Sequence, residues 1–503
     1  MAIDPGLRRL ILPTLLPAFP GLSAPRWALD LVAEGLGGYV IFYYNIADPE
    51  QVGALTASLR EARADVLLSL DEEGGDVTRL AHLAGSPYPG NAALGAVDDP
   101  GLTERIYRAI GLDLRASGFN LNLAPTVDVN TSDHNPTVGT RSFGTDPTRV
   151  SAQAAAAVTG LQSAGVAACA KHFPGHGATS TDSHLALPTV DAPLPLLRER
   201  DLAPFAAAIE AGTQSIMTAH IRVPELTGDL PATFSRAAMV DLLRGELGFT
   251  GVVISDALDM RGVAEIAGST AKGAPRALLA GVDLLCLAGQ CDRDLIEETI
   301  AEIAAAVRAG WLPTSRIEQA AQRVAELSRW TAKTGPDAGA DAAGDGTGAG
   351  IGYPAARRAV RVEGSLTGLG SPLVVQIADA ELNIAAGRVP WGLGPHINGT
   401  EQVQLAPPGE SPERVRALAG TRPIVVVGRN LHRLPGAADL IEALAPTNPV
   451  VAVEMGWPTA WRPAGVRAFV TTFGASRANG WAAASALGLT GASAARVGVD
   501  AIR

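Results

Sequence analysis

The chain has 503 residues, enough for two or three domains with separate cores. Apolar residues make up 47% and charged residues 18%, as in folded globular proteins. The net charge of −11 argues against a nucleic-acid partner and against docking on an anionic membrane. The three cysteines (Cys169, Cys286 and Cys291) have the spacing of neither a disulfide framework nor a zinc site, which indicates a reducing compartment.

The N-terminal region contains a short apolar run, Leu10–Leu16, interrupted by Pro13. We predict that this run is an early strand and not a signal peptide, because it is short and no small-residue cleavage pattern follows it. No segment of the sequence reaches the length of about 18 apolar residues that a membrane-spanning helix needs. The sequence therefore predicts a soluble, cytoplasmic protein.

Short apolar runs alternate with Ala-rich amphipathic stretches through the first two thirds of the chain. The runs are Leu10–Leu16, Tyr39–Phe42, Val66–Leu70, Leu121–Ala124, Val166–Ala170, Ser215–Thr218, Val252–Ile254 and Leu284–Leu287. The intervening stretches Thr103–Ala116, Ser151–Ala164 and Leu202–Glu210 have helical spacing of their apolar residues. Eight strands alternating with helices indicate an α/β fold of the (β/α)8 barrel type. A doubly wound open sheet is the alternative that periodicity alone leaves open.

Polar residues follow most of these predicted strands within a few positions. They are Asn45, Asp71, Asp128, Lys171, His172, His220 and Asp256. In a (β/α)8 barrel the carboxyl ends of all strands converge on one face, where the active site is built. The barrel therefore predicts that these residues, distant in sequence, line one pocket.

Residues 333–352 contain almost no large apolar side chain and are rich in Gly, Ala and Asp. This composition predicts a linker between a catalytic barrel at 1–332 and a C-terminal α/β domain at 353–503. The predicted strands of the C-terminal domain are Leu373–Ile377, Ile424–Val427, Val450–Val453 and Ala468–Val470. Its glycine-rich pieces lack a nucleotide fingerprint, so we assign no cofactor.

The segment KHFPGHG at 171–177, followed by DSH at 182–184, is the densest group of titratable residues. One interpretation is a metal site, with ligands drawn from His172, His176, Asp182, His184 and His220. Pro174 and Gly175 prevent the first two histidines from sharing a helix face, which argues against that interpretation.

The other interpretation is acid/base chemistry beside a carboxylate nucleophile. Asp256 follows the apolar run Val252–Ile254, which places it at a strand end. Retaining glycoside cleavage needs a carboxylate that attacks the anomeric carbon and a second group that protonates the departing oxygen. An imidazolium can supply that proton, and Asp182, two residues before His184, can hold the imidazole in one tautomer.

Four segments carry a resemblance to the β-N-acetylglucosaminidase branch of glycoside hydrolase family 3. They are DEEGG at 71–75, GTRSFG at 139–144, KHFPGHG with DSH at 171–184, and GVVISDAL at 251–258. The likeness covers the barrel half closely and the C-terminal domain, an α/β sandwich in two-domain members, in outline. The sequence departs from the family's usual Gln and Arg at Glu72 and Asp76, which we expect to affect the accepted aglycone and not catalysis.

The resemblance implies a role for each matching residue. Asp256 matches the nucleophile, and Asp182 with His184 matches the dyad in which the histidine is the acid/base. Asp71, Arg141, Lys171 and His172 match residues that hold the sugar hydroxyls. We interpret His176 as part of the loop structure, whereas His220 and Asp128 stay open between pocket wall and orienting residue.

The implied activity is that of an exo-β-N-acetylglucosaminidase, a cofactor-free and metal-free glycoside hydrolase. Its partner is a small saccharide with terminal β-linked N-acetylglucosamine, from peptidoglycan or chitin. Three alternatives keep the barrel: a phosphorylase, since a neutral histidine does not repel phosphate, a β-glucosidase with Glu454 as its acid, and a metal-dependent hydrolase. A sugar-binding protein without catalysis is the alternative from another class.

Overall fold

The computed structural model describes residues 3–334, 348–378, 383–397, 399–406 and 411–490. These residues form two compact units. The first contains residues 3–72, 103–138 and 144–334, and the second contains residues 73–102, 139–143 and those described from 348 onward. Most of the predicted linker lies outside the described residues, and helix α14 begins at Gly348. The domain boundaries at 332 and 353 stay a prediction, and the structure adds two segments of the barrel half, 73–102 and 139–143, to the second unit.

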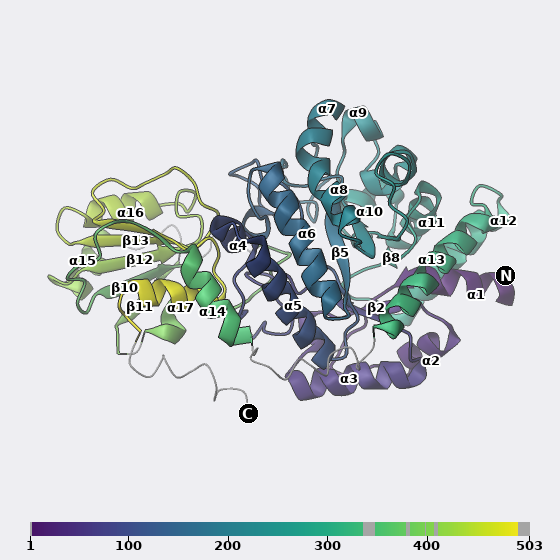
Figure 1. The fold of residues 1–503 in the computed structure, drawn as a ribbon, viewed down its shortest axis with the longest axis horizontal. Helices are drawn as coiled ribbons and strands as arrows, with labels where there is room; N and C mark the ends of the chain where they lie inside the picture. The colour runs from purple at the N-terminus through teal and green to yellow at the C-terminus, as the bar shows by residue number, and fades with distance from the viewer. Residues whose placement is uncertain (1–2, 335–347, 379–382, 398, 407–410, 491–503) are drawn as a thin grey trace. The chain divides into compact units, whose positions relative to one another are not determined.

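The first unit is a barrel of parallel strands surrounded by helices (Figure 1). Its strands are β1 (Leu15–Leu16), β2 (Gly38–Val40), β3 (Leu67–Leu70), β4 (Leu121–Asn122), β5 (Ala167–Phe173), β6 (Ser215–Thr218), β7 (Val252–Ile254) and β8 (Leu285–Cys286). Strands β2 to β7 form one sheet in sequence order, and β8 pairs with β1. The amide of Val40 donates to Pro17, and Ile254 bridges to Leu284, so the strands follow one another around a closed ring.

Helices cover the outside of this ring. They are α1 (Pro5–Ile11), α2 (Arg26–Glu34), α3 (Pro49–Ala62), α5 (Pro100–Ala116), α6 (Pro147–Ser163), α7 (Leu194–Leu196), α8 (Ala203–Glu210), α9 (Pro224–Thr227), α10 (Arg261–Ala267), α11 (Thr270–Ala280), α12 (Arg293–Arg308) and α13 (Thr314–Lys333). 3₁₀ and π-helical segments include η2 (Tyr43–Asn45), η4 (Leu197–Leu202) and η6 (Ala237–Glu246). Aspartates cap several of these helices: Asp48, Asp146 and Asp292 each accept a hydrogen bond from a first-turn amide.

The barrel fold confirms the predicted fold class. Seven of the eight predicted strands match β2 to β8 within a few residues, because short apolar runs buried on both sides are typical of parallel strands. The interior is filled by apolar side chains from successive strands, such as Leu67, Leu121 and Val252. Val324 and Leu327 of α13 belong to the same core.

The prediction for the first strand is wrong over most of its length. Residues Pro5–Ile11 form α1, a 3₁₀ turn follows, and only Leu15 and Leu16 pair as a strand. The side chain of Asp4 accepts a hydrogen bond from the Leu7 amide, and Pro5 occupies the first helical position. These two helix-start signals outweigh the apolar run that follows them.

The second unit is an α/β sandwich built on a six-stranded sheet. The strand order is β11 (Gln402–Leu405), β10 (Leu373–Ile377), β12 (Ile424–Gly428), β13 (Val450–Glu454), β14 (Ala468–Thr471) and β9 (Arg361–Gly364). Only β9 is antiparallel to its neighbour. The helices are α4 (Asn91–Val97), α14 (Gly348–Ala359), α15 (Pro412–Ala419), α16 (Ala437–Leu444) and α17 (Arg477–Ala486).

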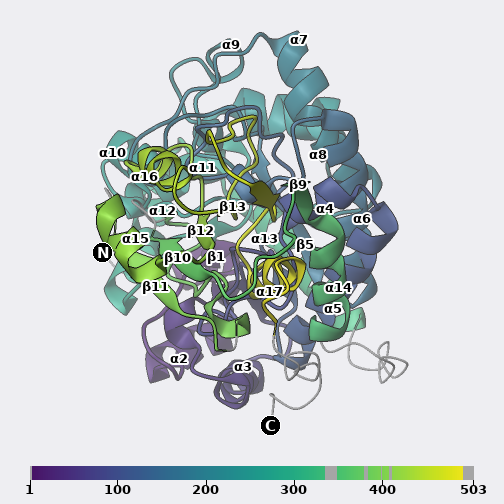
Figure 2. The same ribbon diagram turned by 90° about the vertical axis from the view of Figure 1, so that its left-hand side faces the viewer.

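The two faces of this sheet carry separate cores, because successive strand residues point to opposite sides. Val425, Val451 and Ala483 of α17 belong to one core, whereas Val426 and Leu440 of α16 belong to the other. Figure 2 shows α15 and α16 on one side of the sheet and α14 and α17 on the other. The four strands predicted for this unit are confirmed as β10, β12, β13 and β14.

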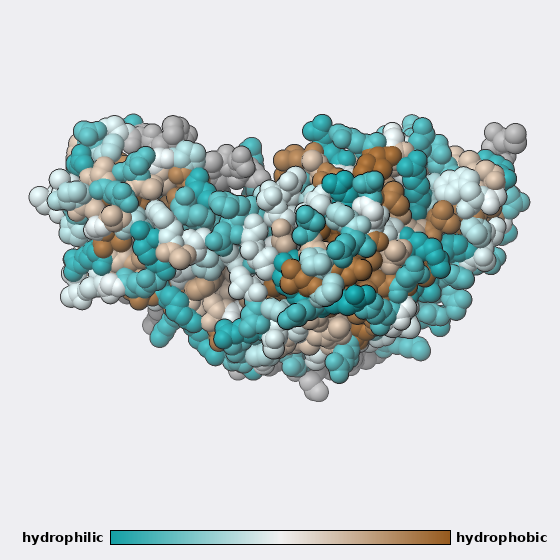
Figure 3. Space-filling model, turned by 90° about the horizontal axis from the view of Figure 1, so that it is seen from above, coloured by the Kyte–Doolittle hydropathy of each residue, from teal (hydrophilic) through white to brown (hydrophobic). Residues whose placement is uncertain are grey.

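Among the described residues, no helix combines the length and apolar character needed to cross a bilayer. The face of the barrel unit visible in Figure 3 shows hydrophobic patches separated by hydrophilic side chains.

A buried ion network joins α13 to the end of the barrel where β8 begins. The carboxylate of Asp283, which is fully buried, accepts hydrogen bonds from Arg244 (2.5 Å), Arg316 (2.6 Å) and Arg323 (3.1 Å). It also accepts a hydrogen bond from the amide of Val253 in β7. One carboxylate therefore compensates three guanidinium groups.

We expect Asp283→Asn to lower the free energy of unfolding by about 3–5 kcal/mol, because buried guanidinium groups would lose their counter-charge. Asp30→Asn breaks the exposed pair with Arg26 and serves as the control, with an expected loss below about 1 kcal/mol. Urea unfolding monitored by tryptophan fluorescence measures both changes. Equal losses for the two variants would contradict this role of Asp283.

Candidate active site

The polar residues at the carboxyl ends of β3 to β7 contact one another around the barrel. The ammonium of Lys171 in β5 lies 2.7 Å from the carboxylate of Asp71, which follows β3. His172, also in β5, contacts Asp128 after β4. His220 after β6 contacts the carbonyl of Ala257 after β7. Residues far apart in the sequence thus meet at one end of the barrel.

Lys171 and Asp71 form a recessed ion pair. The side chain of Lys171 is 2% exposed and that of Asp71 is 18% exposed, so a ligand reaches the carboxylate more easily than the ammonium. A fixed cation beside a carboxylate suits the donor and acceptor pattern of vicinal sugar hydroxyls. The geometry is compatible with the predicted role of both residues.

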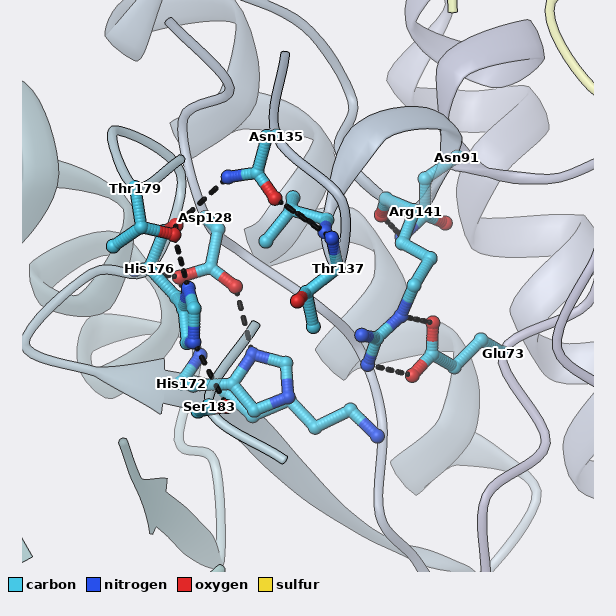
Figure 4. A network of polar contacts seen from close by, with 12 residues as sticks. Glu73, Asn91, Asp128, Asn135, Thr137, Arg141, His172, His176, Thr179 and Ser183 are labelled. Carbon is cyan, nitrogen blue, oxygen red and sulfur yellow. Dashed lines mark hydrogen bonds and ion pairs between the residues drawn. The ribbon is translucent and has the colours of Figure 1, made fainter. Parts of the chain in front are cut away.

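Asp128 organises the segment KHFPGHG (Figure 4). Its carboxylate accepts hydrogen bonds from the ring Nδ1 of His172 (2.8 Å), the amide of His172 (3.3 Å) and the amide of His176 (2.6 Å). Lys171 and His172 lie in an irregular part of β5, because the register of β5 against β6 shifts between Ala170 and Phe173. Burial alone would raise the pKa of Asp128, but the contacts with the two histidines lower it below its usual value.

His176 is part of the loop structure around the strand end. Its Nδ1 lies 2.7 Å from the hydroxyl of Thr179 and its Nε2 lies 3.1 Å from that of Ser183. Its carbonyl accepts a hydrogen bond from the side chain of Asn135, as Figure 4 shows. Burial lowers the pKa of His176 to about 4, so the ring is neutral at physiological pH. A neutral, enclosed imidazole is suited to holding a loop and not to exchanging protons.

Asp182 and His184 form the predicted dyad. The Nδ1 of His184 lies 2.7 Å from Oδ1 of Asp182, and the same oxygen accepts a hydrogen bond from the His184 amide. Burial alone would raise the pKa of Asp182. The hydrogen bonds from His184 outweigh burial and lower the pKa below its usual value, so the carboxylate is anionic. The His184 side chain is 26% exposed. Since Nδ1 faces Asp182, proton transfer to a ligand would use Nε2.

Asp256 is a half-buried carboxylate directly after β7. Its Oδ1 accepts a hydrogen bond from the Ala257 amide at 2.8 Å. Burial raises the pKa of Asp256, but the imidazoles of His220, His172 and His184 outweigh this effect and lower the pKa below the usual value. Asp256 is therefore ionised, which its predicted role as nucleophile requires.

A backbone contact joins the turn after Asp256 to the loop of the dyad. The amide of Gly262, at the start of α10, donates to the carbonyl of Ser183 at 3.3 Å. A Cβ added at Gly262 would lie only 3.0 Å from that carbonyl oxygen, so a larger residue would push the two segments apart. The spacing between the turn after Asp256 and the dyad loop thus depends on Gly262, which no motif in the sequence singles out.

His220, left open by the sequence, contacts the backbone beside Asp256. It is fully buried, with Nε2 2.9 Å from the carbonyl of Ala257 and Nδ1 2.8 Å from the hydroxyl of Thr233. Burial lowers the pKa of His220, so its ring is neutral and donates from Nε2 to the carbonyl. This contact holds the backbone next to Asp256.

Arg141 lies in the second unit, on the turn η3 (Gly139–Arg141). Its guanidinium forms a bidentate pair with Glu73, with distances of 3.0 Å from Nε and 2.8 Å from Nη2. Asn91 donates to the carbonyl of Arg141. Asp76, a departure from the family pattern, accepts hydrogen bonds from the hydroxyl of Thr140 and the amide of Ala475. Glu73 and the departing Asp76 thus have partners within this unit, and the sugar-binding role of Arg141 stays a prediction.

The family model for the N-terminal domain of glycosyl hydrolase family 3 matches residues 25–327. The chain belongs to glycosyl hydrolase family 3. The predicted family is confirmed, and with it the assignment of the protein as a glycoside hydrolase.

The barrel half of this family 3 protein is similar to several curated relatives. A β-hexosaminidase from Chromobacterium violaceum is 38% identical over 51% of this chain and 72% of its own length. Beta-hexosaminidase A from Pseudoalteromonas piscicida is 34% identical over 58% of this chain, and the match spans about half of that relative's length (53%).

The similarity to solved structures extends over both units. A glycoside hydrolase family 3 β-N-acetylglucosaminidase from Paenibacillus sp. FPU-7 is 31% identical, with a TM-score of 0.85. The match covers 97% of this chain and 98% of that protein. The α/β domain after the barrel is therefore shared with a family member.

Glu454, the acid in the β-glucosidase alternative, has a different environment from His184. One carboxylate oxygen accepts hydrogen bonds from the amides of Asn430 and Gly456, and the other from the amide of Leu431, all at 2.6–2.7 Å. Burial raises the pKa of Glu454 to about 7 against the effect of these amides. Three donors that converge on one enclosed carboxylate give Glu454 a role in fixing the turns after β12 and β13.

The metal-site interpretation finds no matching geometry among the described residues, where no group of three or more His, Cys, Asp or Glu side chains is arranged to hold an ion. His172 and His176 instead hydrogen-bond to Asp128, Thr179 and Ser183.

We expect Asp128→Asn to lower kcat/KM for glycoside hydrolysis by about 10–100-fold, mainly through KM. The amide would lose charge-assisted hydrogen bonds worth about 1.5–3 kcal/mol and would release the ring of His172. Asp30→Asn, which breaks the exposed pair with Arg26, serves as the control and should alter kcat/KM by less than about twofold, since exposed ion pairs contribute little. A loss in the control as large as that in Asp128→Asn would show a general effect of folding.

Proposed function

We propose that this enzyme is a retaining exo-β-N-acetylglucosaminidase that releases terminal N-acetylglucosamine from peptidoglycan or chitin fragments. One observation carries the proposal: an ionised carboxylate, Asp256, lies on a turn that is hydrogen-bonded to the loop of an Asp182–His184 dyad. Double-displacement cleavage needs a nucleophile and an acid/base held at a fixed spacing. The similarity to β-hexosaminidases and to a family 3 β-N-acetylglucosaminidase supports the choice of sugar.

In the first step, a carboxylate oxygen of Asp256 attacks the anomeric carbon, and the bond from that carbon to the aglycone oxygen breaks. His184, protonated at Nε2, donates its proton to the departing oxygen and becomes neutral. Asp182 holds the ring through Nδ1 and stabilises the charged imidazolium before transfer. The product of this step is a glycosyl ester of Asp256.

In the second step, neutral His184 accepts a proton from a water molecule. The water oxygen forms the new bond to the anomeric carbon, and the ester bond to Asp256 breaks. The imidazolium and the free carboxylate are restored, so the net reaction is hydrolysis with retention. In this scheme Asp71, Lys171, His172 and Arg141 bind the sugar hydroxyls and keep the anomeric carbon near Asp256.

We propose the cytoplasm as the location, since Cys169, Cys286 and Cys291 are free, buried thiols. A β-glucosidase with Glu454 as its acid is the second candidate function. It has less support, because three backbone amides enclose the carboxylate of Glu454, whereas the ring of His184 is partly exposed. A phosphorylase shares every group of the first step and differs only in the acceptor.

The role of His184 is tested with two aryl β-N-acetylglucosaminides that differ in their leaving groups. We expect His184→Ala to lower kcat/KM by about 10²–10⁴-fold for a phenyl glycoside, whose oxygen needs a proton on departure. The loss should be below about tenfold for a dinitrophenyl glycoside, which leaves without a proton. Steady-state rates of both substrates measure the difference.

Glu454→Gln is the matched variant, since it neutralises the acid of the rival account. It should retain most of the activity toward both substrates. Equal losses for the two leaving groups in His184→Ala would remove His184 as the acid. Abolished turnover in Glu454→Gln, with His184→Ala active on aryl glucosides, would establish the β-glucosidase instead.

A further inference from the structure

A second carboxylate, Asp259, follows the nucleophile by three residues and has no role in the scheme above. It lies in the turn between β7 and α10 and is solvent-exposed. The amide of Asp259 donates to the carbonyl of Leu287, and the amide of Leu258 donates to that of Cys286. Its Oδ2 accepts a hydrogen bond from the amide of Gly289 at 3.3 Å. These contacts fix the turn against the end of β8, so the carboxylate has a defined position at the mouth of the barrel.

The turn of Asp259 lies between the nucleophile and the acid/base loop. Asp256 begins it, and Gly262, which donates to Ser183 next to His184, ends it. The acid/base of a retaining glycosidase acts on the side of the sugar from which the aglycone leaves and where the acceptor enters. Asp259 lies on the segment that joins the nucleophile to the loop of the acid/base, so in the proposed scheme its charge is near the path of the aglycone and the acceptor.

Aromatic side chains stand beside the same turn. A Cβ added at Gly289 would lie 3.9 Å from Cζ of Phe42, so the ring of Phe42 borders the residue that Asp259 binds. Phe42 stacks on Tyr44 with ring centroids 5.6 Å apart and an angle of 9°, and Tyr43 packs edge-on against Tyr44. Asn45 holds this aromatic turn by accepting from the Phe42 amide and donating to the carbonyl of Phe19. Flat, rigid aromatic side chains pack well against the apolar face of an uncharged aglycone ring.

The charge of Asp259 is coupled to both catalytic groups. Although solvent reaches the carboxyl group, protein surrounds much of it, and this partial burial raises the pKa of Asp259. The negative charge of Asp256 raises it further, while the imidazole of His184 lowers it. Asp259 is thus near enough to Asp256 for like charges to repel, and a third anion beside them would meet the same repulsion.

We propose that Asp259 excludes anions from the acceptor and aglycone side of the active site. Water and neutral aglycones are accepted, whereas phosphate and acidic aglycones are repelled. The inference rests on the proposed function only for the roles of Asp256 and His184. It makes Asp259 a specificity-determining residue that favours hydrolysis over phosphorolysis. Of the two substrate classes proposed above, it favours uncharged chitin fragments over peptidoglycan fragments, whose N-acetylmuramic acid carries a carboxylate.

The test compares two aryl glycosides that differ by one charge on the ring, a carboxylate and its carboxamide. They are built on whichever sugar the wild-type enzyme hydrolyses. We expect the wild-type enzyme to prefer the neutral substrate in kcat/KM by about tenfold, and Asp259→Asn to reduce that preference to about twofold or less. Raising the salt concentration to about 1 M, where the Debye length is about 3 Å, should reduce the wild-type preference as well.

The acceptor is tested by measuring sugar 1-phosphate and free sugar at saturating phosphate. The wild-type enzyme should form free sugar, and Asp259→Asn should form a larger fraction of sugar 1-phosphate. Asp259→Glu keeps the charge and should keep both preferences. Asp65→Asn removes one exposed charge at the opposite end of β3 and serves as the matched control, with both ratios unchanged.

Two results would overturn the inference: an unchanged charge preference in Asp259→Asn, or a wild-type enzyme that forms sugar 1-phosphate faster than free sugar. Failure of the proposed function gives a different result. The enzyme would then hydrolyse glucosides and not N-acetylglucosaminides, while the charge preference, measured on glucosides, would still report on Asp259.

Discussion

The closed ring of parallel strands is the constraint on which the candidate site depends. Because all strands run in one direction, the residue after each strand emerges at the same end of the barrel. Lys171 of β5 then contacts Asp71, which follows β3, and His172 contacts Asp128, which follows the neighbouring strand β4. The buried network of Asp283 holds α13 against the opposite end of the barrel. The residues of this stabilising network and the candidate catalytic residues therefore lie at opposite ends.

Burial and charge have opposite effects on the pKa of three carboxylates of the site. Burial would protonate Asp128, Asp182 and Asp256, and in each case neighbouring imidazoles or amides keep the group ionised. The fully buried rings of His176 and His220 are neutral and hold backbone, whereas His184 is partly exposed. The histidine that can exchange a proton with a ligand is thereby distinguished from those that orient the loops.

Much of the fold follows from local patterns in the sequence. Runs such as Val252–Ile254 are buried on both faces. Such a run is too short for a buried helix and is typical of a strand in a parallel sheet. The first strand was mispredicted because Asp4 and Pro5 start a helix within an apolar segment. Strands β9 and β11 were missed because they lie at the sheet edges, where exposed residues such as Arg361 and Glu363 leave no apolar run.

The candidate site was predictable in its residue types and less so in its contacts. Strand ends and the family resemblance together indicated Asp256, His184 and Lys171. The pairing of Asp128 with His172 joins residues 44 positions apart, and no local pattern encodes it. The Gly262–Ser183 contact and the position of Asp259 depend on how two loops pack, which periodicity does not report.

Covalent trapping of the nucleophile tests the central claim most directly. An activated fluorinated glycoside forms the glycosyl ester normally but slows its hydrolysis, so the labelled peptide can be identified by mass spectrometry after proteolysis. The account predicts a single glycosyl adduct on Asp256, absent from the Asp256→Ala variant. A label on Glu454 or on another carboxylate, or turnover with no covalent adduct, would contradict it.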